Sequence, residues 1–167
     1  MPVSRQEFRD AMARLGAAVN IITTDGVAGK GGITATAVCS VTDDPATLLV
    51  CLNRTSPRSA LFLANSVLCV NTLAAAQQSV SDAFSAPSGA LDMAARFAAG
   101  AWTNLVTGAP ALDGAAANFD CRITEVMDQG THSVVFASVE AVRFADMQAG
   151  CLMYYARGYH GLPVTTA

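Results

Sequence analysis

The chain has 167 residues and a formal net charge of −3, and 52% of its residues are hydrophobic while 14% are charged. We expect a single domain spanning residues 1–167, because a chain of this length can bury a core without disulfides or metals. Its high apolar content suggests that part of its surface contacts a partner subunit. The acidic balance argues against a nucleic-acid partner, and the absence of a ~20-residue apolar run or a signal peptide indicates a cytoplasmic protein with no membrane partner.

The N-terminal half predicts a helix followed by short strands. Ser4 and Glu7 have the spacing of a capping box, and apolar residues then recur at helical intervals as far as Gly16. The glycine-rich stretch 26–32 lacks the phosphate-loop pattern, so we expect a flexible hairpin connection. Ser56-Pro57 is typical of a helix start. The expected strands are 17–24, 33–41, 47–52 and 67–73, and the expected helices are 4–16, 57–64 and 75–84.

The C-terminal half predicts further strands after an irregular region. Residues 85–117 are rich in alanine, glycine, proline and serine, and we expect only short helical turns there. Strands are expected at 119–127 and 132–144, joined by a turn at 128–130, and a final short strand at 151–155. Short strands with few helices between them favour an antiparallel barrel over a parallel sheet with crossover helices.

The motifs of several enzyme classes are missing. The chain has two histidines, no hydrolase or metalloprotease motif and no Rossmann fingerprint, so we expect an organic cofactor and no metal site. The five cysteines are far apart in the sequence and are expected to be buried strand thiols; they are Cys39, Cys51, Cys69, Cys121 and Cys151.

Two segments have the composition of a binding site for such a cofactor. The stretch 32–40 combines small residues with the hydroxyls of Thr34, Thr36 and Ser40, although it also fits an ordinary strand. The stretch 52–59 contains two arginines and three hydroxyl residues at a strand-to-helix junction, which suits a phosphate. The alternative is a capped helix with solvated arginines.

Several motifs occur in order along the chain and together carry a family resemblance. They are Phe8-Arg-Asp-Ala-Met12, the segments 16–26, 33–43 and 48–53, Leu68-Cys-Val-Asn-Thr-Leu73, Arg96-Phe97, Gly130-Thr-His132 and Tyr155-Ala-Arg-Gly-Tyr-His160. From about residue 8 to residue 160 the chain resembles the short-chain flavin reductases, which are the reductase components of two-component flavin-dependent monooxygenases. The likeness is greatest to the reductases of pyrimidine utilisation and of 4-hydroxyphenylacetate hydroxylation.

The resemblance implies a mainly β fold, an FMN-binding split β-barrel of antiparallel, Greek-key type with a few peripheral helices, acting as a homodimer. It implies that the segment 34–37 lines the isoalloxazine ring, that 53–56 holds the ribityl phosphate region and that His132 lies on the nicotinamide side. The cofactor-binding residues expected on this basis are Thr34, Ala35, Thr36, Ala37, Ser40, Asn53, Arg54, Thr55, Ser56, Ser59, Arg96, Phe97, Arg157 and Tyr159.

The activity implied by the resemblance is hydride transfer from NADH, or NADPH, to FMN or FAD, with the reduced flavin supplied to a partner monooxygenase of pyrimidine utilisation or aromatic hydroxylation. Such a transfer needs positioning rather than a general base. Three alternatives stay open: a flavin carrier without turnover, a reductase with tightly bound flavin that acts on another acceptor such as a corrinoid, and a structural dimerisation module. His132 has a structural alternative, and His160 is expected to belong to the scaffold.

Overall fold

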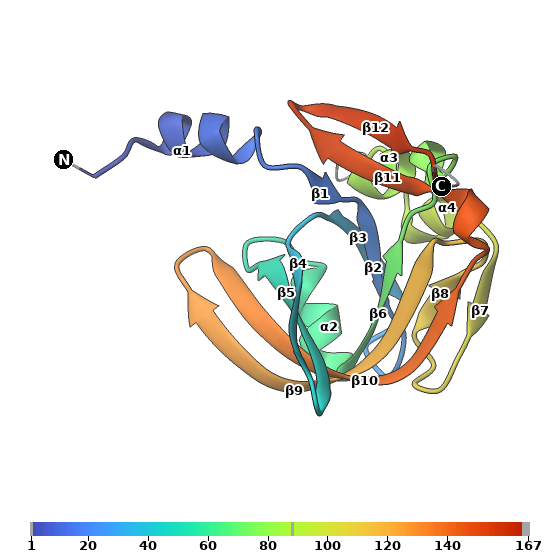
Figure 1. The fold of residues 1–167 in the computed structure, drawn as a ribbon. Helices are drawn as coiled ribbons and strands as arrows, with labels where there is room; N and C mark the ends of the chain where they lie inside the picture. Colours follow the sequence, from blue (N-terminus) through green and yellow to red (C-terminus); the bar gives the residue numbers. More distant parts are fainter. Residues whose placement is uncertain (1, 88, 165–167) are drawn as a thin grey trace.

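The computed structural model describes residues 2–87 and 89–164, which form a split antiparallel β-barrel (Figure 1). Its main sheet has the order β3-β2-β6-β9-β10-β5-β4, and every neighbouring pair is antiparallel. This confirms the mainly β fold expected from the sequence. The strands are β2 (Asn20–Thr24), β3 (Gly31–Ala35), β4 (Val38–Asp43), β5 (Ala46–Asn53), β6 (Val67–Thr72), β9 (Ala117–Gln129) and β10 (His132–Phe144).

The expected strand 33–41 is wrong as a single strand. The chain pairs with β2 as far as Ala35, which lies opposite Asn20, and from Val38 it pairs with β5. Thr36 and Ala37 connect the two edges of the sheet, and both are exposed. The barrel is therefore split at these two residues. The break was not predicted, because the hydrophobic pattern of a segment does not show that its strand partner changes.

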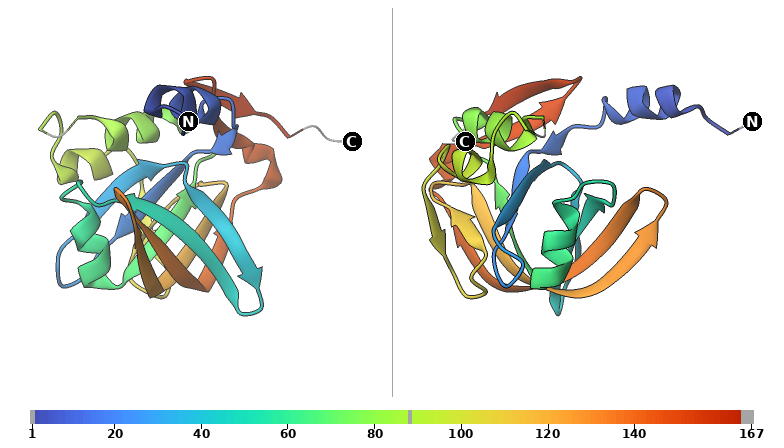
Figure 2. Two further views of the ribbon diagram at one scale, coloured as in Figure 1. Left: turned by 90° about the vertical axis from the view of Figure 1, so that its left-hand side faces the viewer. Right: turned by 180° about the vertical axis from the view of Figure 1, so that it is seen from behind.

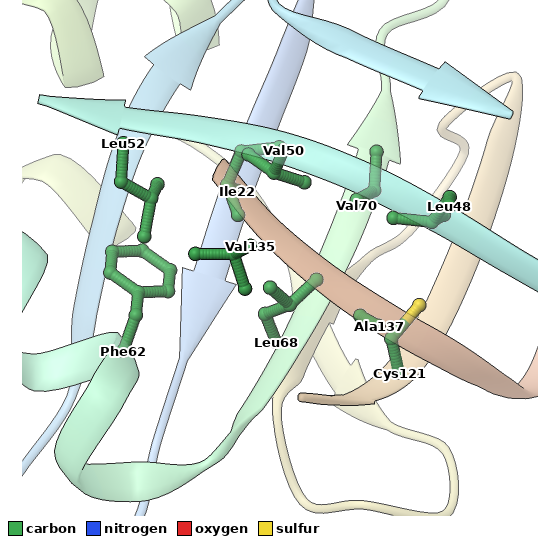
Figure 3. Close-up of a cluster of buried hydrophobic side chains, with 10 residues drawn as sticks. All are labelled: Ile22, Leu48, Val50, Leu52, Phe62, Leu68, Val70, Cys121, Val135 and Ala137. Carbon is green, nitrogen blue, oxygen red and sulfur yellow. The ribbon is translucent and has the colours of Figure 1, made fainter. Parts of the chain in front are cut away.

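The interior of the barrel is one apolar cluster (Figure 3). Buried residues alternate along β5, where Leu48, Val50 and Leu52 point inward. Helix α2 (Ser59–Asn65) adds Phe62, which packs against the cluster, and its side chain is fully buried. The helix begins two residues later than expected and has Arg58, with no side-chain cap, at its N-cap position.

A second apolar cluster covers the outer face of β2. It includes Ile21 of β2 and Phe84 of helix α3 (Gln78–Ser85), together with residues of helix α4 (Met93–Phe97) and strand β11 (Cys151–Tyr155). Because a cluster lies on each side of β2, all five of its residues are buried. The backbone of Gly32 lies against the Phe84 ring, and a Cβ at that position would come within 2.4 Å of it.

Three further elements correct the sequence expectations. The region 85–117 contains helix α4 and a hairpin of β7 (Trp102–Asn104) and β8 (Pro110–Leu112), and is therefore more regular than expected. The expected strand 17–24 divides at Val19 into β1 (Ala17–Ala18) and β2. Strand β11 is not the last strand, because β12 (Gly158–Leu162) follows it, pairs with it and completes the sheet β1-β11-β12. The 3-10 helix η1 (Met147–Ala149) lies just before β11.

Helix α1 (Arg5–Met12) projects from the barrel (Figures 1 and 2). Its predicted capping box is confirmed, since Ser4 Oγ accepts from Glu7 N at 3.2 Å and Ser4 N donates to Glu7 Oε2 at 2.8 Å. None of its residues is buried. Two contacts with the β11–β12 turn tether this end of the chain: Ala156 N donates to Ala13 O at 2.7 Å, and Arg157 pairs with Asp10.

The cysteines are all free thiols, but they differ in burial. Cys69 and Cys121 are buried, and desolvation raises the pKa of Cys69 and raises that of Cys121 to about 12. Cys39 is exposed, so the expectation that all five are buried is wrong for this strand residue. Among the described residues there is no helix long and apolar enough to cross a membrane and no group of three potential metal ligands.

Candidate active site

A cavity of about 770 Å³ lies between helix α1 and the β3–β4 junction. Thr36 and Ala37 form part of its wall on the barrel side, and Phe8 and Met12 line it from α1. Tyr154 of β11 also lines this cavity. The cavity is within the size range of small-molecule and cofactor sites, and its lining combines apolar, aromatic and polar groups.

Thr36 and Ala37 line this cavity, and their backbone N–H groups are not paired in the sheet. Within the described residues, neither backbone N–H donates a hydrogen bond, and the Thr36 hydroxyl has no partner. The Ala37 carbonyl accepts from Cys51 N at 3.0 Å, which fixes the junction against β5. Small side chains on a fixed backbone leave room for a flat ring and offer it N–H donors.

A smaller cavity of about 380 Å³ adjoins the first, and Thr36 and Tyr154 line both. Thr34 Oγ1 donates to Ser81 O at 3.0 Å, and the Ser81 hydroxyl lies 2.8 Å from Tyr159 OH. The rings of Tyr154 and Tyr159 meet edge to face with centroids 5.5 Å apart. Thr34 and Tyr159 therefore belong to the same hydrogen-bonded wall, and Ala35 lines the cavity beside them.

A third cavity, of about 390 Å³, lies between the loop after β5 and the β9–β10 hairpin. The loop is held by its own side chains: Asn53 Oδ1 accepts from Thr55 N at 3.0 Å and from Thr55 Oγ1 at 2.9 Å. Ser59 Oγ donates to Asn53 O at 2.6 Å. Arg54, Thr55, Ser56 and Ser59 line the cavity. Because the Thr55 and Ser59 hydroxyls already donate to Asn53, the cavity offers an anion one cation and the Ser56 hydroxyl.

Strand β5 lies between residues that line the first cavity and residues that line the third. Cys51 bonds to Ala37 and Asn53 lies two residues further on, a separation of about 7 Å along a strand. His132 is the cross-strand partner of Asn53 at the start of β10. Its ring is exposed, and its Nδ1 lies 2.9 Å from Thr131 Oγ1. The residues of the segments 34–37 and 53–59 thus meet at one end of β5, with His132 beside them.

Arg96 and Phe97 do not join these groups. Arg96 is 1% exposed, and its guanidinium donates to the carbonyls of residues 83, 84, 86, 87 and 91 at 2.6–3.2 Å. These bonds use all five N–H groups of the side chain. Phe97 packs on Phe84 and Trp102. This geometry leaves no N–H group of the Arg96 side chain free for the cofactor contact that the resemblance implied.

Ser40 and Arg157 are placed differently from the expectation. Ser40 lines a separate cavity of about 280 Å³ between β4 and β6, where Thr72 and Phe119 also lie, rather than the cavity beside Thr36. Arg157 lines the large cavity, but its guanidinium pairs with Asp10 of α1. This hydrogen bond is the main reason that the pKa of Asp10 is lowered, and a bond from Gln6 adds to the effect.

Two residues of the cavities were missed by sequence reasoning. Asp128 was read as part of a turn, yet it lines the third cavity and pairs with Arg54 at 3.2 Å. Tyr154 was read only as part of a strand, yet it lies between the first two cavities. The alternation of exposed and buried residues in a hairpin gives no signal for either role.

The residues present fit a flavin nucleotide. The N–H groups of the exposed residues Thr36 and Ala37 donate no hydrogen bond within the described residues and suit the polar edge of a flat ring, and Arg54 with the Ser56 hydroxyl suits a phosphate. The donor set is therefore that of a ligand with an aromatic end and an anionic end.

Comparisons with known proteins show the family to which the chain belongs. The model of the family described as flavin reductase like domain matches residues 12–163. The chain is 55% identical to the FMN reductase (NADH) RutF of Stutzerimonas stutzeri (strain A1501) over 161 residues, which are 96% of this chain and 90% of the relative. It is 44% identical to a crystal structure from Haemophilus somnus 129pt assigned as a flavin reductase, with a TM-score of 0.91 over 96% of this chain and all of the other.

A further solved structure is BorF, the flavin reductase component of a bacterial two-component tryptophan halogenase. It is 26% identical to this chain with a TM-score of 0.88, and the alignment covers 97% of this chain and all of BorF. The family match spans most of the chain, and both structures share its fold. The protein therefore belongs to the family of flavin reductase like domains.

Proposed function

We propose that this protein is an NADH-dependent FMN reductase that supplies reduced flavin to a partner monooxygenase. The observation that carries the proposal is the exposed pair Thr36 and Ala37, which line the large cavity in a chain 55% identical to an FMN reductase (NADH). The likeness to a reductase component of a two-component system supports transfer of the product to another enzyme.

The Thr36–Ala37 junction would bind the ring end of the flavin. A bound flavin supplies the acceptor for the hydride that leaves C4 of the nicotinamide. The N–H groups of the junction would stabilise the negative charge that grows on the ring, because they are already oriented before the reaction. Phe8 and Met12 would exclude water from the same cavity.

The loop 53–59 would bind the phosphate end. Arg54 supplies a positive charge, and Ser56 supplies a hydroxyl. Asn53 and Ser59 act by holding the loop in shape through the bonds described above. His132, exposed beside this loop, would donate a hydrogen bond to the nicotinamide carboxamide and orient its ring.

The proposed assembly is a homodimer. Phe8, Met12 and Leu15 are 58%, 46% and 62% exposed, although they lie at helical intervals on α1 and the stretch that follows it. An isolated helix of eight residues is marginal in water, so a second copy that covers these side chains would stabilise it. The free thiols, including exposed Cys39, fit a reducing compartment such as the cytoplasm.

The proposal is tested by following NADH oxidation at 340 nm with the purified protein, with and without FMN. We expect oxidation only when flavin is present, and a higher kcat/KM with FMN and NADH than with FAD or NADPH. Flavin binding by fluorescence quenching without NADH oxidation would contradict the reductase and support a flavin carrier.

A further inference from the structure

Arg54 is held by the β9–β10 hairpin from three directions. Its Nη2 lies 3.2 Å from Asp128 Oδ2, and its Nη1 donates to Gly130 O at 3.4 Å. Its backbone N donates to Thr131 O at 3.0 Å. The cation of the 53–59 loop is therefore bonded to the tip of the neighbouring hairpin.

Asp128 is itself fixed in orientation. Ser133, its cross-strand partner, donates from Oγ to Asp128 Oδ1 at 2.7 Å, and Ser133 is only 4% exposed. One carboxylate oxygen thus bonds to a buried hydroxyl and the other faces Arg54. The ion pair itself is accessible, since the side chains of Arg54 and Asp128 are 48% and 52% exposed.

The cavity beside this pair contains one cation and one carboxylate. Arg54 and Asp128 both line it, together with Thr55, Ser56 and Ser59. A phosphate dianion that approaches Arg54 meets the like charge of Asp128 within the same cavity. When the phosphate binds to Arg54, either the ion pair between Arg54 and Asp128 breaks or the phosphate is repelled by the nearby Asp128 carboxylate.

We propose that Asp128 is a specificity-determining residue that competes with a phosphate monoester for Arg54. This rests on the proposed function, because the phosphate in question is that of the flavin nucleotide. This competition lowers the affinity of the site for the phosphate end of the flavin and does not change the binding of the ring end. The enzyme then accepts flavins with and without a phosphate at similar affinities, and releases the flavin after each turnover.

The test compares FMN with riboflavin, which has the same ring and no phosphate. Dissociation constants are measured by flavin fluorescence quenching for the wild-type protein and for Asp128→Asn, which keeps the shape of the side chain and removes its charge. We expect Asp128→Asn to bind FMN about three- to five-fold more tightly, the range of a half-exposed charge interaction, with riboflavin unchanged. The gain should shrink as salt is raised.

A matched control is Asp113→Asn, which removes the same charge from a similar pair, Asp113 with Arg143 at 3.2 Å. We expect it to leave both affinities unchanged, so that a general effect of net charge is separated from a local one. An unchanged or weaker affinity of Asp128→Asn for FMN overturns the proposal, as does an equal change for both flavins. Wild-type NADH oxidation with either flavin tests the reductase alone and is independent of this comparison.

Discussion

At the scale of single residues, two arginine side chains of the chain have different surroundings. Arg96 and Arg54 both lie in motifs of the family resemblance, but Arg96 is buried among carbonyls and Arg54 is half-exposed in a cavity. Thr36 and Ala37 line the first cavity and Arg54 lines the third, and their contact with a flavin stays a prediction. The carbonyls that surround Arg96 come from the end of α3 and from the loop that follows it, and the sequence has no pattern that shows this side chain turned toward them.

Replacement of Arg96 should affect stability rather than catalysis. Arg96→Met leaves five carbonyls without their donor, and we expect a loss of about 2–4 kcal/mol in the free energy of unfolding. The melting temperature should fall, while the KM values for NADH and FMN of the folded protein stay near wild type. Unchanged stability with raised KM values would show instead that Arg96 contacts a ligand.

Replacement of His132 should affect catalysis rather than stability. The ring is exposed and its one close polar neighbour is the Thr131 hydroxyl, so His132→Asn should leave the melting temperature unchanged. We expect a roughly five-fold rise in the KM for NADH, the size of one lost hydrogen bond. If both the KM for NADH and kcat keep their wild-type values, the proposed contact with the nicotinamide does not exist.

At the scale of elements, local sequence patterns predicted a helix or strand correctly where the whole element has one set of neighbouring elements. The capping box of α1 and the strand at 47–52, which corresponds to β5, were predicted because both depend on neighbours in the sequence. The break at Thr36 and Ala37 was missed, since it depends on which strands lie beside each half of the segment. Strand β12 was missed because it contains glycines and follows a two-residue turn.

The tether of α1 should be visible in the titration of Asp10. The hydrogen bond from Arg157 lowers the pKa of Asp10, so the contact is complete at neutral pH and is lost only as the pH falls through that lowered pKa. In an NMR titration we expect an Asp10 pKa below the usual aspartate range, and a rise toward that range in Arg157→Ala. The same low pKa in both proteins would mean that Arg157 does not hold the helix.

At the scale of the whole molecule, the barrel brings the segments 34–37 and 53–59 to one end of β5, and α1 lies apart from it (Figure 2). The proposed dimer predicts a mass by light scattering of twice the 17.2 kDa of one chain. Replacing Phe8 and Met12 by aspartate should favour the monomer, because their apolar side chains would no longer be buried between copies. A wild-type protein of 17.2 kDa at micromolar concentration would contradict the dimer.

The most direct test of the site is a crystal structure of the protein with FMN. We expect the flavin ring to lie against the N–H groups of Thr36 and Ala37. We expect the phosphate to lie within hydrogen-bond distance of Arg54 and of the hydroxyl of Ser56. A flavin bound elsewhere, or one whose phosphate lies away from the loop 53–59, would contradict the assignment of these cavities.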